Sequence, residues 1–311
     1  MRVWRAIEGV EGVEGVNRSV VTIGNFDGVH RGHQHVIDLV VARARESGAT
    51  AVVVTFDPHP MSVIHPGGAP LALTTLDHRL ELIAKRGVDA TLVLPFTHEL
   101  SQLSPEEFVK QVLVEALHVI EVHVGANFRF GHRAAGTIDT LRELGTAYGF
   151  ATHPVDLARD DTVWSSTYVR QCLAEGDVVA AARALGRLHR VEGPVVEGDK
   201  RGRELGFPTA NLALGDEVAI PEDGIYAGWL TRASGVRLPA AVSIGTNPTF
   251  DGTTRRVEAY VLDRDDLELY GEHVVVEFVE RLRDTLRFDG VDALLVQMAA
   301  DVDQARAILV P

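Results

Sequence analysis

The sequence predicts an α/β plus β protein, in which a doubly wound parallel sheet is followed by a small antiparallel β-barrel and a C-terminal helix. In residues 1–186, short β-branched apolar runs alternate with segments of helical spacing. This alternation favours right-handed crossovers between parallel strands. From about residue 188 the runs become short and numerous, with turn residues and no helices between them, which is typical of a small barrel. With 311 residues the chain is long enough for two cores, and we expect domains at 1–186 and 187–311.

Strands and helices alternate through the expected first domain. We expect strands at residues 20–23, 50–56, 90–94, 120–124 and 151–155, and helices at residues 32–47, 76–86, 104–117, 137–148, 168–175 and 177–186. The start of the third helix is marked by Ser104 as N-cap, Pro105 at the first helical position and Glu107 closing a capping box. The repeat GVEGVEGV at residues 9–16 is too short for a solenoid, so we interpret it as a surface connector.

The expected second domain consists of strands followed by one helix. We expect the strands at residues 189–197, 225–231, 237–244, 256–262 and 273–281. Residues 291–309 form an amphipathic helix whose apolar stripe contains Leu294, Leu295, Met298, Val302 and Ile308. We expect this stripe to pack against the barrel.

Composition and charge limit the classes of partner. The chain is 46% hydrophobic and 24% charged, which is ordinary for a globular protein. A formal net charge of −14 argues against general binding of nucleic acid or of an anionic membrane. Cys172 is the only cysteine, which excludes a disulfide framework and fits a reducing compartment. Because the start MRVWRAIEGV has no apolar signal core, we expect a cytoplasmic protein. The sequence leaves self-association open.

The stretch TIGNFDGVHRGHQHV, residues 22–36, predicts a phosphate site at the end of the first buried strand. A strand that leads through a glycine-containing turn into a helix points backbone N–H groups and a positive dipole end at a ligand. His30 and His33 are three residues apart and so share one face of the first helical turn. The candidate residues are Gly24, Phe26, Gly28, His30, Gly32 and His33. Two purely structural histidines remain an alternative, and a metal pair is disfavoured because zinc sites need three or four ligands.

Further candidates follow other predicted strands of the first domain. Asp57 and His59 come after the second strand, and Asn127 and Phe128 come after the fourth. The carboxyl ends of parallel strands are where open α/β sheets bind ligands. An ordinary proline-rich loop and an aromatic cluster packed on its own domain are the alternatives for these two segments.

Ser166, Thr167 and Arg170 predict a second helix N-terminus that binds phosphate. Capping accounts for one hydroxyl residue at a helix start, but it does not account for the arginine.

The expected barrel carries its own phosphate-binding pattern. The loop GDKRGRELG combines glycines with cations, and we select Gly198, Lys200, Arg203 and Gly206 from it. A solvated basic hairpin tip is the alternative, and the loop lacks the spacing of a Walker motif. Thr209 and Asn211 are two residues apart, so in an extended segment they share a face and offer oxygen ligands to Mg²⁺. Glu258 interrupts an apolar strand and is either exposed at an edge or a buried base.

Taken together, these motifs resemble one known family. HRGH within GNFDGVHRGHQ resembles the His-x-Gly-His signature of nucleotidyltransferases, and SSTYVR resembles their second motif. TFDPHP, GANFRFG, GFPTAN, SIGTNPTFDG, RRVEAYVLD and LYG…VEFVERLR resemble the bacterial bifunctional riboflavin kinase/FMN adenylyltransferases, also called FAD synthetases. The resemblance covers nearly the whole chain, with the motifs in the order of the family.

The resemblance implies a nucleotidyltransferase (Rossmann-like) domain and a riboflavin kinase barrel. It implies ATP, riboflavin, FMN and FAD as substrates or products, with Mg²⁺ as the metal. Thr209 and Asn211 would lie at the magnesium–ATP site and Glu258 would be the general base. His30, His33 and Arg170 would act in adenylyl transfer, and the flavin would contact Asp57, His59, Asn127, Phe128 and Arg281. Two alternatives stay open, namely an adenylyltransferase for another substrate with a degenerate barrel and a non-catalytic flavin or nucleotide sensor.

Overall fold

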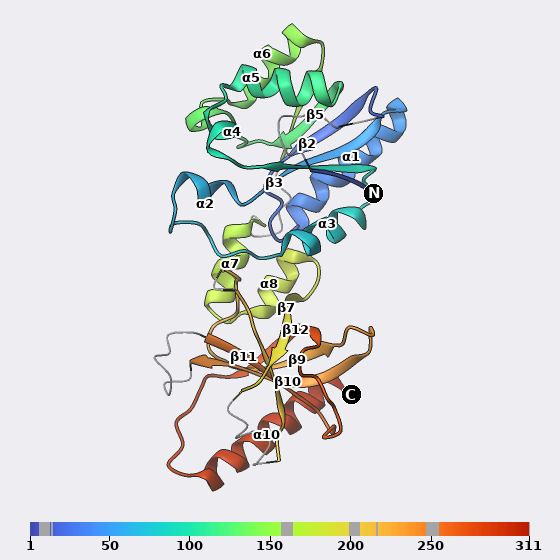
Figure 1. The fold of residues 1–311 in the computed structure, drawn as a ribbon. Helices are drawn as coiled ribbons and strands as arrows, with labels where there is room; N and C mark the ends of the chain where they lie inside the picture. The colour runs from blue at the N-terminus through green and yellow to red at the C-terminus, as the bar shows by residue number, and fades with distance from the viewer. Residues whose placement is uncertain are drawn as a thin grey trace. The chain divides into compact units, whose positions relative to one another are not determined.

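The computed structural model describes residues 1–5, 13, 15–156, 164–198, 206–215, 217–246 and 255–310 (Figure 1). The chain divides into two compact units, Met1–Ser166 and Thr167–Pro311. Most of the GVEGVEGV segment lies outside the described residues, so its interpretation as a connector stays a prediction.

The first unit is built on a parallel sheet with the strand order β1-β4-β3-β2-β5-β6. The strands are β1 (Arg2–Arg5), β2 (Ser19–Ile23), β3 (Thr50–Asp57), β4 (Ala90–Pro95), β5 (Val119–Gly125) and β6 (Ala151–Val155). All five residues of β2 are buried, because this strand lies between β3 and β5. The predicted doubly wound sheet is confirmed. The sheet contains one strand, β1, that the sequence did not predict. This strand has only four residues and an arginine at each end, so it lacks the apolar run by which the others are recognised.

Helices cover both faces of this sheet (Figure 1). They are α1 (Arg31–Ser47), α2 (Pro60–Ile64), α3 (Leu76–Ala84), α4 (His98–Gln102), α5 (Pro105–Phe108), the π-helical η1 (Val109–Ala116), the 3-10 turn η2 (His132–Ala134) and α6 (Ile138–Tyr148). Val20 packs with α1 and α3 in one buried cluster, whereas Val21 packs with α5, η1 and α6 in another. Successive residues of β2 therefore serve two cores. The predicted capping box at Ser104 and Glu107 is confirmed.

The second unit contains a closed antiparallel barrel with the strand order β10-β11-β8-β7-β12-β9. The strands are β7 (His189–Val196), β8 (Thr209–Leu212), β9 (Gly224–Thr231), β10 (Arg237–Thr246), β11 (Arg255–Val261) and β12 (His273–Arg283). The predicted barrel is thus confirmed. We did not predict β8 as a strand, because it is four residues long, follows Pro208 and includes the polar Thr209 and Asn211.

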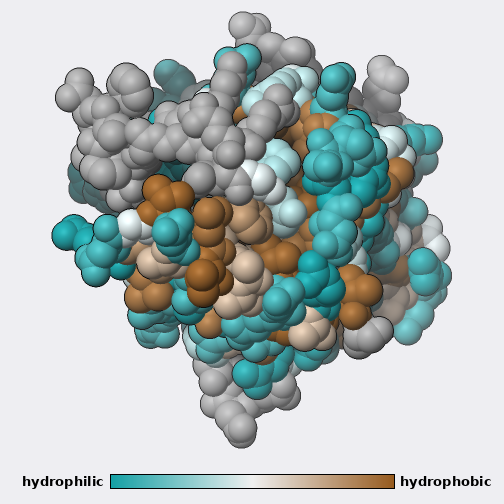
Figure 2. Space-filling view, turned by 90° about the horizontal axis from the view of Figure 1, so that it is seen from below, coloured by the Kyte–Doolittle hydropathy of each residue, from teal (hydrophilic) through white to brown (hydrophobic). Residues whose placement is uncertain are grey.

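Helix α10 (Val291–Leu309) covers part of the barrel with the second half of its predicted apolar stripe. Ala305 and Leu309 are buried against barrel residues, and Val302 and Ile308 pack beside them. The first half of the helix is more exposed, with Val296 73% accessible. Figure 2, a view from below, shows apolar residues interspersed with polar ones on that face of the molecule.

Two helices precede the barrel, α7 (Ser166–Ala174) and α8 (Val178–Leu185). Apart from Ser166 they belong to the same compact unit as the barrel. The Glu222 N–H donates to the Leu173 carbonyl at 2.8 Å, and α8 contacts β7 and β12. The sequence pattern assigns these helices to the first domain, and the division between residues 186 and 187 stays a prediction.

Candidate active sites

The turn between β2 and α1 is held by the buried carboxylate of Asp27. Its oxygens accept hydrogen bonds from the backbone N–H groups of Leu73 and Thr74 at 3.0 and 3.1 Å. The Gly28 N–H donates to the Thr74 hydroxyl at 3.2 Å. Phe26 has a φ of 48°, which is uncommon for a residue other than glycine. These bonds hold the turn in a conformation that the sequence would not otherwise favour.

His30 and His33 lie together at the start of α1. His30 is the N-cap, and its Nδ1 accepts the His33 N–H at 3.3 Å. The two rings are stacked with centroids 3.6 Å apart, so they share a face as their spacing predicted. An ideal Cβ at Gly32 would lie 3.1 Å from the His30 ring and 3.2 Å from the Trp164 carbonyl oxygen. The glycine therefore allows the His30 ring to pack closely against the helix.

The His33 imidazole suits hydrogen bonding better than charge neutralisation. Burial, together with the charges of His30 and Arg79, lowers the pKa of His33 well below its ordinary value. The His33 ring is therefore neutral near pH 7. Its Nδ1 is buried and has no hydrogen-bond partner among the described residues. A neutral ring carries one donor and one acceptor nitrogen.

Arg79 is a buried cation that our sequence reasoning missed. It lies on α3 and donates to the Phe56 carbonyl at 3.1 Å, while its Nε is buried without a hydrogen-bond partner in the described part of the chain. Burial lowers the pKa of Arg79, although Asp27 and Asp57 oppose that shift. The signal in the sequence was a charged residue on the helix face that carries Leu80 and Ile83.

The ends of β3 and β5 supply the other predicted residues of this unit. Asp57 is exposed at the end of β3, and His59 caps α2 with its Nδ1, which accepts the Met61 N–H at 3.1 Å. The side-chain amide nitrogen of Asn25 lies 3.2 Å from Nε2 of His59, so the β2 and β3 ends meet here.

After β5, the two predicted residues differ in exposure. Asn127 is exposed, whereas the half-buried Phe128 stacks on Phe130 at 5.5 Å and packs against the core. Packing on its own domain therefore accounts for part of the aromatic cluster.

Ser166 connects the second motif to the first. Its hydroxyl donates to the Asp27 carbonyl at 2.9 Å. Thr167 is exposed, and the half-buried Arg170 lies one turn further along α7.

On the barrel, Thr209, Asn211 and Glu258 lie on one face of two paired strands. Glu258 in β11 is directly opposite Asn211 in β8, and its Oε2 accepts the Thr209 hydroxyl at 3.2 Å. Val257 and Ala259 on either side are buried, so Glu258 points away from the barrel core and is half-buried.

The residues of this face fit a magnesium ion. Oδ1 of Asn211 is buried and has no hydrogen-bond partner among the described residues. An ideal Cβ at Gly198 would lie only 2.5 Å from Asn211 Nδ2. Glycine at this position therefore makes room for the amide. Hydroxyl, amide and carboxylate oxygens are the ligands that Mg²⁺ prefers.

The remaining predicted residues of the barrel either lie outside the described structure or have contacts that point to no ligand. Lys200 and Arg203 lie outside the described residues. Gly206 has a left-handed φ of 85°. Arg281 donates to the Asp223 carbonyl at 2.6 Å and pairs with Asp284 at 3.2 Å, so it has structural contacts in addition to any role toward flavin.

A doubly wound sheet with paired imidazoles at the end of a strand, and a barrel with a face of oxygen-bearing side chains, suit a two-domain phosphotransfer protein. The family model for FAD synthetase matches residues 14–168, and the model for riboflavin kinase matches residues 185–309. The chain is 36% identical to the bifunctional riboflavin kinase/FMN adenylyltransferase of Escherichia coli K12, over 92% of this chain and 91% of the relative. It is 38% identical to the protein of the same name from Listeria monocytogenes, over 93% and 92% of the two chains. The chain belongs to the bifunctional riboflavin kinase/FMN adenylyltransferase family.

The fold is also similar to a solved structure with a different description. A crystal structure described as a macrolide-efflux protein from Streptococcus pneumoniae matches with a TM-score of 0.89 and 31% identity, covering 98% of this chain and 99% of that one. That description applies to the other protein, whereas the family assignment here rests on the two family models and the curated relatives. Within the described residues, no helix has the length and apolar character needed to cross a membrane.

Proposed function

We propose that this chain catalyses two consecutive reactions, the ATP-dependent phosphorylation of riboflavin to FMN and the adenylylation of FMN to FAD. The observation that carries the proposal is that each unit brings its own group of predicted site residues together. Stacked imidazoles follow β2 in the first unit, and Thr209, Asn211 and Glu258 share a face of the barrel in the second. Each group falls within the family model for the corresponding reaction. The single cysteine fits a reducing compartment, and we propose that the protein acts in the cytoplasm.

In the barrel, Glu258 accepts the proton of the riboflavin 5′-hydroxyl. The hydroxyl oxygen attacks the γ-phosphorus of ATP, the bond from that phosphorus to the bridging oxygen breaks, and ADP leaves. Glu258 is half-buried beside the Thr209 hydroxyl, which orients the carboxylate. Because such transfers demand little covalent chemistry, positioning and charge stabilisation supply most of the rate.

Thr209 and Asn211 are the residues that would hold Mg²⁺, since the buried Asn211 Oδ1 is without a partner in the described structure. When bound, the ion neutralises phosphate charge and orients the phosphates. Gly198, Lys200, Arg203 and Gly206 belong to the loop that we propose binds the polyphosphate of ATP.

In the first unit, a phosphate oxygen of FMN attacks the α-phosphorus of ATP, and pyrophosphate leaves. The nucleophile is already ionised, so the site needs hydrogen-bond donors around the reacting phosphorus rather than a strong base. His30 and His33 supply these donors, with Gly24, Phe26, Gly28 and Gly32 shaping the turn that presents them. Ser166, Thr167 and Arg170 bind the leaving pyrophosphate. Asp57, His59, Asn127 and Phe128 bind the flavin.

The experiment compares two variants that each disable one reaction. His33→Ala should lower FAD formation by on the order of 10²–10³, the usual cost of losing one donor to a transition state, while FMN still accumulates from riboflavin. The assay is chromatography of FMN and FAD after mixing protein, riboflavin and Mg-ATP. If both products fell equally in a folded variant, the assignment of His33 to one reaction would be wrong.

Glu258→Gln is the reciprocal variant. It should stop phosphorylation of riboflavin yet leave FAD synthesis from supplied FMN unchanged, because it keeps the size of the side chain and removes the base. Unchanged phosphorylation would remove Glu258 from its role. Wild-type protein that formed no FMN from riboflavin would favour a degenerate barrel, and protein that formed neither product would favour a sensor.

A further inference from the structure

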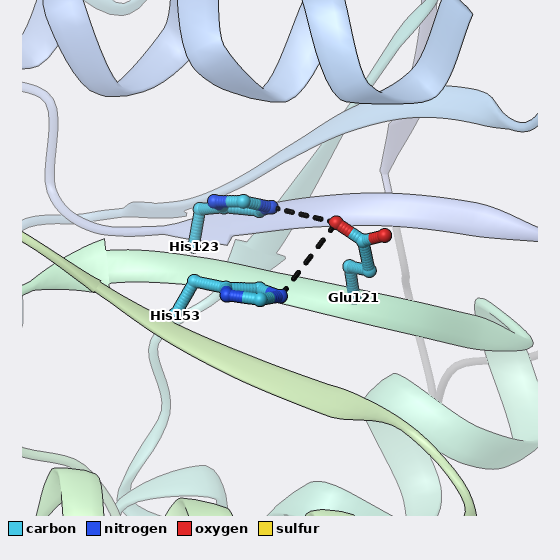
Figure 3. Close-up of side chains that lie close together, drawn as sticks. All are labelled: Glu121, His123 and His153. Atoms are coloured by element: carbon cyan, nitrogen blue, oxygen red, sulfur yellow. Dashed lines mark hydrogen bonds and ion pairs between the residues drawn. The ribbon is translucent and has the colours of Figure 1, made fainter. Parts of the chain in front are cut away.

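Three potential metal ligands lie together on β5 and β6, among residues to which we assigned no role (Figure 3). Glu121 and His123 are two residues apart on β5 and therefore share a face of the sheet. The strand register places His153 of β6 directly beside His123. Pairing of neighbouring strands thus brings a carboxylate and two imidazoles to one place.

The side chains converge on a common point. Oε2 of Glu121 is 3.1 Å from Nε2 of His123 and 3.8 Å from Nε2 of His153. One potential ligand atom from each residue lies within 4.8 Å of the other two. In Figure 3 both rings direct a nitrogen toward the same carboxylate oxygen.

We propose that Glu121, His123 and His153 bind a divalent transition-metal ion of the zinc type. Two imidazole nitrogens and one carboxylate oxygen are a known donor set for zinc with three protein ligands, whereas Mg²⁺ and Ca²⁺ prefer oxygen ligands alone. Bonds of about 2.0–2.1 Å in a tetrahedron place ligand atoms roughly 3.3 Å apart. The contact of Glu121 with His123 is already close to that value. His153 must approach the Glu121 oxygen by about half an ångström. It must also approach His123, because the two stacked rings have centroids 4.7 Å apart, and its side chain, 46% exposed on an edge strand, has room to move.

An ordinary ion pair explains only part of this cluster. Arg43 of α1 already pairs with Glu121, with Nη2 at 2.8 Å from Oε1 and Nε at 3.1 Å from Oε2. The carboxylate therefore has its countercharge without either histidine. His153 makes only a long contact to it, and the two rings are stacked with centroids 4.7 Å apart. Packing alone does not require both rings to turn a nitrogen to one oxygen.

The surroundings favour a bound cation. Arg43 also pairs with Glu46 at 2.7 Å, so two carboxylates face one guanidinium and the group keeps a net negative charge. Metal-bound carboxylates are commonly held in place by such outer hydrogen bonds.

The ion would join the edge strand β6 to β5. Such a bridge stabilises the folded first unit by binding only when both strands are in register. The proposal does not depend on the flavin chemistry, because none of its three ligands has a role in it.

The experiment uses the full chain stripped of metal, with excess Mg²⁺ and no nucleotide, and Co²⁺ as the probe. We expect visible absorption bands of four-coordinate Co²⁺ that saturate at one ion per chain and disappear when Zn²⁺ is added. His153→Ala should weaken Co²⁺ binding at least tenfold. His98→Ala removes an exposed histidine of the same unit that belongs to no such cluster, and it should bind as the wild type does.

A second variant and a second measurement exclude other sites. Because His30 and His33 also form a pair, His33→Ala should retain the absorption bands. Zn²⁺ should raise the unfolding temperature of the wild type and of His98→Ala, but not that of His153→Ala. The proposal is overturned if wild-type protein shows no saturable Co²⁺ binding, or if His153→Ala binds Co²⁺ with unchanged affinity. In the presence of Mg²⁺ and without added Zn²⁺ or Co²⁺, FAD formation by His153→Ala should equal that of the wild type, which separates this proposal from the proposed function.

Discussion

Replacing Gly198 with alanine tests whether Asn211 acts in riboflavin phosphorylation. The added Cβ would lie 2.5 Å from Nδ2 and 2.7 Å from Cγ of Asn211. Non-bonded heavy atoms prefer separations of about 3.5–4.0 Å. The amide must therefore move by about 1 Å. Since the clash is with the end of a side chain rather than with backbone, we expect the barrel to fold normally.

A displacement of about 1 Å in a catalytic constellation can cost about 100-fold in rate, which corresponds to about 2.7 kcal/mol. We therefore expect kcat/KM for riboflavin phosphorylation to fall by about that factor, with a higher Mg²⁺ requirement. FAD synthesis from supplied FMN should not change. The assay is FMN production over a range of Mg²⁺ concentrations.

Gly215→Ala is the matched control, because an added Cβ there meets nothing within 4 Å and the position has no left-handed φ. Asn211→Ala and the double variant Gly198→Ala/Asn211→Ala complete a double-mutant cycle. If the Cβ acts only through the amide, the double variant should be no slower than Asn211→Ala alone. Phosphorylation within about twofold of wild type in Gly198→Ala would refute the assignment of Asn211.

Two further predictions concern the first unit. Gly32→Ala should lower FAD formation by on the order of tenfold, because its Cβ would lie 3.1 Å from the His30 ring and displace it. An unchanged rate of FAD formation would contradict this prediction. Arg43→Gln should lower the urea concentration at the midpoint of unfolding at neutral pH, because it removes the ion pair with Glu121. Arg43 holds the pKa of Glu121 at about 2, below its ordinary value of 4.5, so the stabilisation is complete above pH 4.5 and is lost as pH falls toward 2. A deficit that did not shrink over this range would show that Arg43 stabilises the fold by another route.

Much of the fold was predictable because burial imposes a period on the sequence. The continuous apolar run of β2 and the apolar stripe of α10 needed no coordinates to recognise. The two unpredicted strands, β1 and β8, are each four residues long and are rich in charged or polar residues. Pairing with a neighbouring strand, rather than an apolar pattern of their own, makes them extended.

The candidate sites were predictable in residue type and only partly in arrangement. The spacing of His30 and His33 predicted that they share a face, and their rings are indeed stacked. Arg79 was missed because its burial depends on contacts with β3, which no local pattern reveals. The need for glycine at position 198 also depends on tertiary structure, since the Asn211 amide that it accommodates lies 13 residues further along the chain.

The two edge strands of the parallel sheet, β1 and β6, bear on how the protein avoids aggregation. A strand with unpaired backbone groups is a template on which another chain can add, and a closed barrel offers no such template. The sheet, by contrast, has two outer strands. At β1 the exposed Arg2 and Arg5 repel a second copy of the same strand, and at β6 Pro154 has no N–H to donate. Positive charge on edge strand β1 and the missing backbone N–H on edge strand β6 therefore disfavour the pairing of sheets from different molecules at high concentration.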